Sequence, residues 1–233
     1  MRSRPFQREK TFGCHCRLLI LSPSMTSKAP FQKLAHYVPA YNAEFSGIPV
    51  KRLLEIGVAN GGSLRWWKRK FPEAQIFGID VSEKCKKHAE DRIEVIICDQ
   101  ANREEMAKIG KQHGPFDVVI DDGGHKRYQQ MASFEALWPY LSKPGCYCVE
   151  DLHANYWFGC NPFSAAYGGF VRDAAKLAHV LNSGWIGKKH PVRWLVGKTP
   201  VVVDDLVKIS FYDSMVFIHK GEHPETFLVS EET

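Results

Sequence analysis

The chain has 233 residues and a formal net charge of +5, and its length suits a single domain with a full core. The longest apolar run near its start, residues 18–21, is far too short to span a bilayer, so we expect a soluble protein. Residues 1–30 hold six basic residues and one acid, so the rest of the chain is neutral, which argues against a surface that follows nucleic-acid phosphates.

Residues 1–30 are predicted to form a basic, disordered tail. A targeting peptide, an electrostatic tether and a true start at Met25 are the alternatives. Cys14, His15 and Cys16 could bind a metal, but no second pair at zinc-site spacing follows them. The number of cysteines is seven, an odd number, and several of them lie in apolar runs, which favours a reducing compartment and hence the cytoplasm.

From residue 51 onward, apolar strand patterns alternate with amphipathic stretches. This alternation is typical of a parallel sheet covered by helices on both faces. Residues 31–50 are predicted to form a helix and a loop across the top of the sheet. Parallel strands are predicted at residues 51–58, 75–81, 93–99, 116–121 and 145–150.

The last two apolar runs, residues 206–213 and 215–220, are separated by Ser214 alone. This connection is too short for a crossover helix, so the two runs should pair as an antiparallel hairpin. The predicted fold class is therefore α/β: a class I methyltransferase (Rossmann-like) fold with a seven-stranded, mostly parallel sheet. The domain is expected over residues 31–220, and residues 221–233 form a C-terminal tail.

The first predicted strand leads into LLEIGVANGGS, where an acid precedes a glycine-rich turn and a helix. Gly57 and Gly61 allow close backbone approach, and Ser63 is placed to cap the helix. The pattern is E-x-G-x-x-x-G instead of G-x-G-x-x-G, and Glu55 would repel a dinucleotide's pyrophosphate. S-adenosylmethionine has no phosphate and carries cationic groups that a carboxylate favours, so we predict this cofactor. A tight turn without a ligand is the alternative.

Acidic and amide side chains follow the next strands at their carboxyl ends, where open α/β sheets bind ligands. Asp80, which lies 23 residues after Gly57, can accept hydrogen bonds from both ribose hydroxyls. Asp99 and Gln100 can meet the adenine amino group. Asp121, at the end of the fourth strand, is assigned to the cofactor with them. Each of these acids alone could instead cap a loop.

The fourth and fifth strands lead into VVIDDGGH and CVEDLHANYW. Neighbouring strands lie about 4.8 Å apart, so their tips can bring Asp122, Glu150 and Asp151 around one point. Three unpaired carboxylates in a partly dry cleft are costly unless they are protonated or neutralised. A hard divalent cation resolves this cost, with Mg²⁺ preferred over Mn²⁺ or Ca²⁺. Capped turns with arginine partners are the alternative.

His125 follows one glycine turn after these acids and can take a proton from a substrate hydroxyl near pH 7. His153 is a weaker base candidate or a substrate contact. Tyr156 and Trp157 directly follow the acidic pair and are candidates for a wall that stacks on a sugar ring. Tyr37, in the segment before the first strand, is a candidate contact for the methionine end of the cofactor, as is Tyr41.

The chain resembles the metal-dependent sugar O-methyltransferases of macrolide and related glycoside biosynthesis, which include mycinamicin, macrocin and rhamnosyl O-methyltransferases. The resemblance rests on the runs LEIGVANGGSLRWWKRKFPEAQIFGID, CDQ, FDVVIDDGGH and VEDLHANYW and covers about residues 31–220. It implies a methyltransferase that depends on S-adenosylmethionine and Mg²⁺. The methyl acceptor would be a hydroxyl of a sugar or glycosylated small molecule.

The resemblance also implies roles for single residues. Asp122, Glu150 and Asp151 would hold Mg²⁺, and His125 would be the base. Gly124 stands before this histidine, where such motifs often have Ser. The residues that would hold S-adenosylmethionine are Glu55, Gly57, Asp80, Asp99 and Gln100. Family members with known macrolide specificity also have an N-terminal domain, and the resemblance does not include that domain.

Other functions stay open at this point. One is a methyltransferase that acts on protein, RNA or another small molecule, and a second is a nicotinamide-dependent oxidoreductase. A third is a non-catalytic module that binds a nucleoside. Sequences of this type are also labelled cephalosporin hydroxylase-like. That activity would require an iron site with histidines, which the all-oxygen cluster does not favour. The acceptor is not identified by the sequence, and assembly into a homo-oligomer is open.

Overall fold

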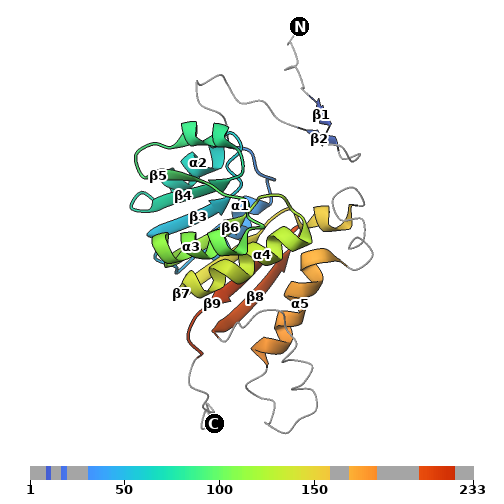
Figure 1. Cartoon of the computed structure of the whole chain (residues 1–233). Helices are drawn as coiled ribbons and strands as arrows, with labels where there is room; N and C mark the ends of the chain where they lie inside the picture. The colour runs from blue at the N-terminus through green and yellow to red at the C-terminus, as the bar shows by residue number, and fades with distance from the viewer. Residues whose placement is uncertain (1–8, 12–16, 20–30, 158–167, 183–204, 224–233) are drawn as a thin grey trace, which may run out of the picture.

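The computed structural model of the protein describes residues 9–11, 17–19, 31–157, 168–182 and 205–223 (Figure 1). Two short strands, β1 (Glu9–Thr11) and β2 (Arg17–Leu19), pair antiparallel in a sheet of their own. Cys14, His15 and Cys16, the candidate metal ligands near the N-terminus, lie outside the described residues, as does most of the predicted C-terminal tail. Both tails therefore remain predictions.

Seven strands of the described chain form the main sheet in the order β5-β4-β3-β6-β7-β9-β8. Neighbours from β5 to β7 pair in parallel, while β9 pairs antiparallel with both β7 and β8. The strands are β3 (Arg52–Ile56), β4 (Gln75–Asp80), β5 (Ile93–Ile97), β6 (Phe116–Asp121), β7 (Leu141–Val149), β8 (Leu206–Tyr212) and β9 (Met215–Lys220). The predicted mostly parallel sheet with a C-terminal hairpin is confirmed.

The strands agree with their predicted ranges to within two residues at each end, except at the start of the fifth parallel strand. The sequence analysis places the start of this strand at residue 145, after Ser142, Lys143 and Pro144. In the structure β7 begins at Leu141, which pairs with Phe116 before the register shifts. This irregularity lets the polar residues stay partly exposed at the start of a strand that is buried further on.

Helices cover both faces of the sheet, as predicted. The helices are α1 (Tyr37–Glu44), α2 (Gly62–Lys70), α3 (Arg103–His113), α4 (Arg127–Leu137) and α5 (Gly169–Leu181), with 3₁₀ turns at Glu83–His88, Trp138–Tyr140 and Leu152–Tyr156. In Figure 1, α3 and α4 lie across the face of the sheet toward the viewer. Buried residues of α3, α4 and α5 pack on this face, and those of α1 and α2 pack on the other.

The two cores follow from the alternation of side chains along each strand. In β3, Leu53 belongs to the core under α1 and α2, and Leu54 belongs to the core under α3, α4 and α5. Neither side chain has exposed area, and full burial of each contributes about 1.5–3 kcal/mol. Since both faces are covered, β3 reads as a nearly continuous apolar run, which is typical of a central parallel strand.

The parallel strands all end at one edge of the sheet, which we call the carboxyl edge. Here β6 and β7 are direct neighbours, with Asp121 opposite Val149. The backbone N–H of Glu150 donates to the carbonyl of Asp121 over 2.9 Å. The prediction that the two acidic motifs lie side by side is therefore confirmed at the level of the backbone.

No helix in the described part of the chain is both long enough and apolar enough to cross a membrane.

Candidate active site

A cleft of about 440 Å³ opens at the carboxyl edge, and we call it the edge cleft. This volume falls in the range of small-molecule and cofactor sites. The predicted cofactor residues that line it are Gly57, Ser63, Asp80, Asp99 and Gln100. Glu55, Gly61 and Asp121 were assigned to the cofactor as well, but they are not among the residues that line the cleft.

The two glycines of the turn after β3 are required by contacts within the protein. A Cβ on Gly57, whose φ is 97°, would lie 2.1 Å from the carbonyl oxygen of Asp122. A Cβ on Gly61, whose φ is 70°, would lie 2.7 Å from the ring of His88. Both positions also need the left-handed backbone that glycine adopts without strain. Gly57 therefore lets the turn lie close to the acidic motif after β6, and Gly61 lets it lie close to His88.

The prediction that Ser63 caps the helix after the glycine-rich turn is wrong. Helix α2 begins at Gly62, and its N-cap is Gly61, which has no side chain to accept a hydrogen bond. The side-chain oxygen of Asn60 accepts instead from the backbone N–H of Gly62 over 3.0 Å. Ser63 lies one residue inside the helix and lines the edge cleft.

Asp80 and Asp99 line the edge cleft and also hold loops in place. The carboxylate of Asp80 accepts backbone hydrogen bonds from Val58, Ala59 and Ser82 over 2.8 to 3.1 Å. Burial would raise the pKa of Asp80, but these N–H groups outweigh burial and lower it. Asp99 accepts from the backbone N–H of Ala101. Both acids therefore have the loop-capping role that the sequence analysis left open.

Asp121 and Gln100 tie the tips of β5 and β6 together. The carboxylate of Asp121 is fully buried and accepts from the Gln100 amide over 3.0 and 3.2 Å and from the Ser133 hydroxyl over 2.6 Å. The Gln100 oxygen accepts from the backbone N–H of Gly124 over 2.7 Å. Burial raises the pKa of Asp121, although the bonds from Ser133 and Gln100 oppose the shift. Asp121 thus positions Gln100, which lines the cleft, without lining the cleft itself.

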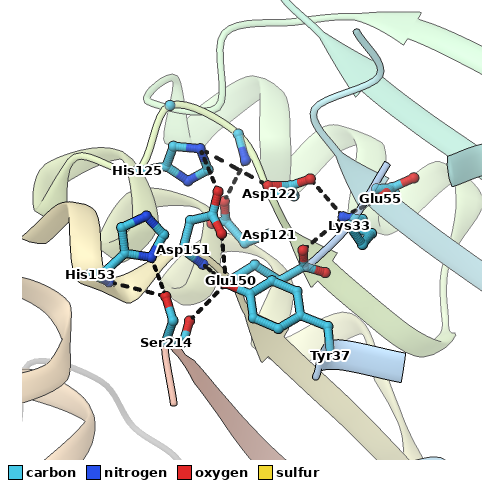
Figure 2. A network of polar contacts seen from close by, with 12 residues as sticks. Lys33, Tyr37, Glu55, Asp121, Asp122, His125, Glu150, Asp151, His153 and Ser214 are labelled. Carbon is cyan, nitrogen blue, oxygen red and sulfur yellow. Dashed lines mark hydrogen bonds and ion pairs between the residues drawn. The ribbon is translucent and has the colours of Figure 1, made fainter. Parts of the chain in front are cut away.

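Lys33 lies at the centre of the acidic edge, as Figure 2 shows. Its Nζ lies 2.6 Å from Asp122 Oδ2, 2.7 Å from Glu150 Oε2 and 3.1 Å from Glu55 Oε1. Its side chain is only 3% exposed. Burial alone would lower the pKa of Lys33, but the three carboxylate charges raise it well above its ordinary value. We call Lys33, Glu55, Asp122 and Glu150 the Lys33 cluster.

Two tyrosines of α1 fix the acidic pair after β7. The hydroxyl of Tyr41 donates to Glu150 Oε1 over 2.5 Å, so each oxygen of this buried carboxylate has a partner. Burial raises the pKa of Glu150, and Lys33 opposes the shift. The hydroxyl of Tyr37 donates to Asp151 Oδ1 over 2.6 Å. Burial and the charge of Asp151 raise the pKa of Tyr37, which keeps its proton.

A second group, which we call the His125 cluster, consists of Asp122, His125 and Asp151. One ligand atom from each residue lies within 4.8 Å of the other two. His125 Nε2 is 3.7 Å from Asp151 Oδ2 and 4.0 Å from Asp122 Oδ1. The three side chains are 25 to 31% exposed. His125 and Asp151 have φ angles of 55° and 53°, a strained backbone that is common at functional sites.

The His125 cluster fits a divalent cation. Two carboxylates converge there beside the imidazole of His125, and partial exposure leaves room for water, as Mg²⁺ sites require. Of the three predicted metal ligands, Asp122 and Asp151 lie in this cluster. Glu150 does not, because Lys33 and Tyr41 hold its two oxygens.

The candidate substrate residues follow Asp151 on the 3₁₀ turn Leu152–Tyr156. Nδ1 of His153 contacts the hydroxyl of Ser214, and its ring lies edge-on to Trp157 with centroids 4.8 Å apart. The side chain of Tyr156 points outward and is 55% exposed. These residues lie beside the His125 cluster, and their contact with a substrate remains a prediction.

Sequence reasoning missed Lys33 because it is far from its partners along the chain. It is 89 residues from Asp122 and 117 from Glu150, and it precedes the first predicted strand in a segment of mixed composition. The available signal was indirect. An excess of buried acids at one edge requires a cation, and Lys33 lies in the segment 31–50 that is predicted to cover the sheet.

The chain is similar to known methyltransferases. Residues 54–152 match a family model described as a methyltransferase domain. The mycinamicin VI 2''-O-methyltransferase of Micromonospora griseorubida is 40% identical over 215 residues, which cover 84% of this chain and 50% of the relative. A rhamnosyl tetracenomycin-C 2'-O-methyltransferase of Streptomyces olivaceus is 31% identical over 194 residues, covering 79% of this chain and 50% of the relative.

A solved structure of the MycE methyltransferase from the mycinamycin biosynthetic pathway, in complex with Mg and SAH, is similar with a TM-score of 0.72 and 32% identity. The similarity covers 82% of this chain and 51% of that one. It confirms the predicted class I methyltransferase fold. The chain spans about half the length of the curated relatives it matches.

Proposed function

Since the chain carries a class I methyltransferase domain homologous to antibiotic sugar O-methyltransferases, we propose that it methylates a hydroxyl of a sugar or glycosylated small molecule. The methyl donor is S-adenosylmethionine, and Mg²⁺ is required. One observation carries the proposal: Asp122 lines the edge cleft and also belongs to the His125 cluster. A donor in the cleft and an acceptor at the cluster would therefore meet at one residue.

The edge cleft would hold the cofactor along the tips of β3, β4 and β5. Asp80 would accept from the ribose, and Asp99 and Gln100 would lie at the adenine. The carboxylate of Asp122, which lines the cleft, would favour the cationic methionine end. The similar structure of MycE contains Mg and SAH, which supports both groups together in this fold.

Asp122 and Asp151 would hold the metal beside His125. When bound, Mg²⁺ orients a hydroxyl and lowers its pKa. The predicted third ligand, Glu150, would have to exchange its bond with Lys33 to reach an ion. The alternative ions Mn²⁺ and Ca²⁺ use the same oxygen ligands.

His125 would accept the proton of the acceptor hydroxyl at Nε2, which faces both carboxylates of its cluster. Asp151, 3.7 Å away, would stabilise the imidazolium that forms. The hydroxyl oxygen would attack the methyl carbon as the carbon–sulfur bond breaks, so the electron pair stays on sulfur and the donor leaves as a neutral thioether. Tyr37 would keep Asp151 oriented throughout.

The proposal is tested with purified protein, S-adenosylmethionine, Mg²⁺ and a panel of glycosides, with products followed by mass spectrometry. We expect a product heavier by one CH₂ group and complete loss of turnover on chelation. The same panel includes protein and RNA acceptors and a nicotinamide assay. Transfer to protein or RNA with none to any glycoside would overturn the acceptor class, and turnover that survives chelation would overturn the role of the metal.

His125→Ala separates the chemistry from binding. Loss of the general base should lower kcat by about 10²–10⁴-fold, while calorimetric affinity for S-adenosylmethionine stays within about twofold. His179→Ala is the control, because this histidine is exposed on α5 and belongs to neither cluster. An equal loss of kcat in both variants would contradict the role of His125.

The proposal includes a cytoplasmic location and a glycosylated small molecule as partner. Four cysteines in the described residues, Cys85, Cys98, Cys146 and Cys148, are free, which fits a reducing compartment. Assembly of the chain with further copies remains a prediction.

A further inference from the structure

Two loops meet at one end of the edge cleft. The loop after β5 carries Gln100, whose side-chain oxygen accepts from the backbone N–H of Gly124, in the loop after β6, over 2.7 Å. The approach is so close that a Cβ on Gly123 would lie 2.0 Å from the same oxygen. Asp99 and Gln100 line the cleft here, so this is the end at which the proposed function places the adenine of the methyl donor.

The side chain of Gln129 lies at the same end of the cleft. This residue belongs to the first turn of α4 and lines the edge cleft. A Cβ on Gly124 would lie 2.2 Å from Gln129 Oε1 and 2.6 Å from Gln129 Nε2. The amide thus occupies the space that a side chain at position 124 would fill, and the glycine gives Gln129 its place in the wall of the cleft.

The oxygen of this amide has no partner in the described part of the protein. Gln129 Oε1 is shielded from solvent, and no described group donates a hydrogen bond to it. An acceptor that is left without a partner in the interior is destabilising. The outermost torsion of a glutamine side chain is broad, so the amide can turn from Gly124 toward the cleft at little cost. A ligand that supplies an N–H donor there satisfies the oxygen.

The other amide side chains that line the cleft are engaged elsewhere. Both ends of the Gln100 amide are used within the protein, since it donates to a carboxylate and accepts from a backbone N–H. The side-chain oxygen of Asn60 accepts from the backbone of its own turn. Gln32 precedes Lys33 at the acidic end of the cleft. Among the amides that the described residues place along the cleft, Gln129 is therefore the one available to the base.

We propose that Gln129 is a cofactor-binding residue whose amide pairs with the adenine of S-adenosylmethionine and selects this base. The inference rests on the proposed function in one respect, the place of the adenine in the edge cleft. An amide suits adenine because its oxygen accepts from the N6 amine while its N–H donates to N7. Hypoxanthine has a carbonyl at position 6, so one pair of facing groups fails to match in either orientation of the amide. Asp99 offers acceptors alone and cannot make both contacts.

The test is calorimetric binding of three compounds to the whole chain. They are S-adenosylhomocysteine, S-inosylhomocysteine, which carries hypoxanthine, and S-tubercidinylhomocysteine, whose base has a carbon in place of N7. The natural protein should bind the first about 10- to 100-fold more tightly than the second, with the third between them. Gln129→Met keeps the length of the side chain without its amide. This variant should bind S-adenosylhomocysteine about tenfold or more weakly and S-inosylhomocysteine within about twofold of the natural protein.

Gln112→Ala is the matched control, because this glutamine is exposed on α3 and does not line the cleft. It should change none of the three affinities. Two results for Gln129→Met would overturn the proposal. An equal loss of affinity for all three compounds would mean that Gln129 only supports the wall of the cleft, and an unchanged affinity for S-adenosylhomocysteine would mean that it makes no contact with the base. Gln129→Leu repeats the test if the Met variant does not fold, as judged by circular dichroism.

Failure of the proposed function would look different. If the natural protein binds none of the three compounds, the edge cleft is not the cofactor site, and the role of Gln129 is overturned with it. If the natural protein binds them with the expected selectivity but transfers no methyl group to any glycoside, the acceptor class is overturned and the assignment of Gln129 is supported.

Discussion

The two sides of Asp122 are neutralised in different ways. On one side, Lys33 is 3% exposed, and Glu55 and Glu150 have no exposed side-chain area, so the ion pairs of Lys33 form inside the protein, although neither Glu55 oxygen has a hydrogen-bond partner. On the other side, His125 and Asp151 are 26 and 31% exposed, and two acids face a histidine across 3.7 to 4.0 Å. The Lys33 cluster is buried inside the folded protein, and the His125 cluster is open to a ligand.

The difference shows that an excess of acids does not identify a metal site by itself. A buried carboxylate must be paired or protonated, and the chain can supply the cation from a distant segment. What distinguishes the His125 cluster is partial exposure together with left-handed backbone at His125 and Asp151, because strain of this kind persists where function requires it.

The largest effect should come from the residue that both clusters share. Asp122→Asn removes a predicted metal ligand and a partner of Lys33 at once, so we expect kcat to fall by at least about 10³-fold and stability to fall as well. Turnover by mass spectrometry and urea unfolding measure the two effects. Asp151→Asn is the control, since it belongs to the His125 cluster alone. A variant of Asp122 that loses turnover without losing stability would separate Asp122 from Lys33.

Next in size is the stability carried by the Lys33 cluster. Lys33→Met leaves three acids at the edge without their cation, and breaking a buried ion pair in this way costs about 3–5 kcal/mol. Urea unfolding without metal measures the loss, and Lys33→Arg should recover part of it. Addition of Mn²⁺ should also restore stability to Lys33→Met, because an ion bound only by the folded state stabilises it. A Met variant as stable as the natural protein would show that Lys33 is dispensable.

Much of the fold could be predicted from local sequence. The strands of the parallel sheet are apolar runs separated by helices, and their order along the sheet follows from connection rules. The hairpin of β8 and β9 follows from the single residue Ser214 between them. The start of β7 could not be predicted, because Pro144 reads as a strand break and a shift in register absorbs it.

The candidate site could be predicted as far as strand ends determine it. Asp122 and Asp151 meet near His125 because β6 and β7 are neighbours. The environment of Glu150 could not be predicted, because it depends on Lys33 and Tyr41, which come from the segment before the first strand of the main sheet. Contacts at such separation leave no periodic signal in the sequence.

The smallest effects should come from the two tyrosines of α1, and they compare the clusters most finely. Tyr41→Phe removes the hydroxyl that donates to the buried carboxylate of Glu150 over 2.5 Å. An acceptor left unsatisfied in the interior costs about 1–3 kcal/mol. Tyr37→Phe removes the bond to Asp151 over 2.6 Å, but water can replace this donor because Asp151 is 31% exposed.

We therefore expect a stability loss for Tyr37→Phe nearer about 0.5–1 kcal/mol, together with a fall in kcat, because the carboxylate beside His125 becomes less well oriented. Tyr41→Phe should show the reverse, a larger stability loss with a smaller change in kcat. Urea unfolding and steady-state kinetics on the same preparations measure both. Equal stability losses in the two variants would mean that water reaches neither cluster. The Lys33 cluster and the His125 cluster would then not differ in their access to solvent.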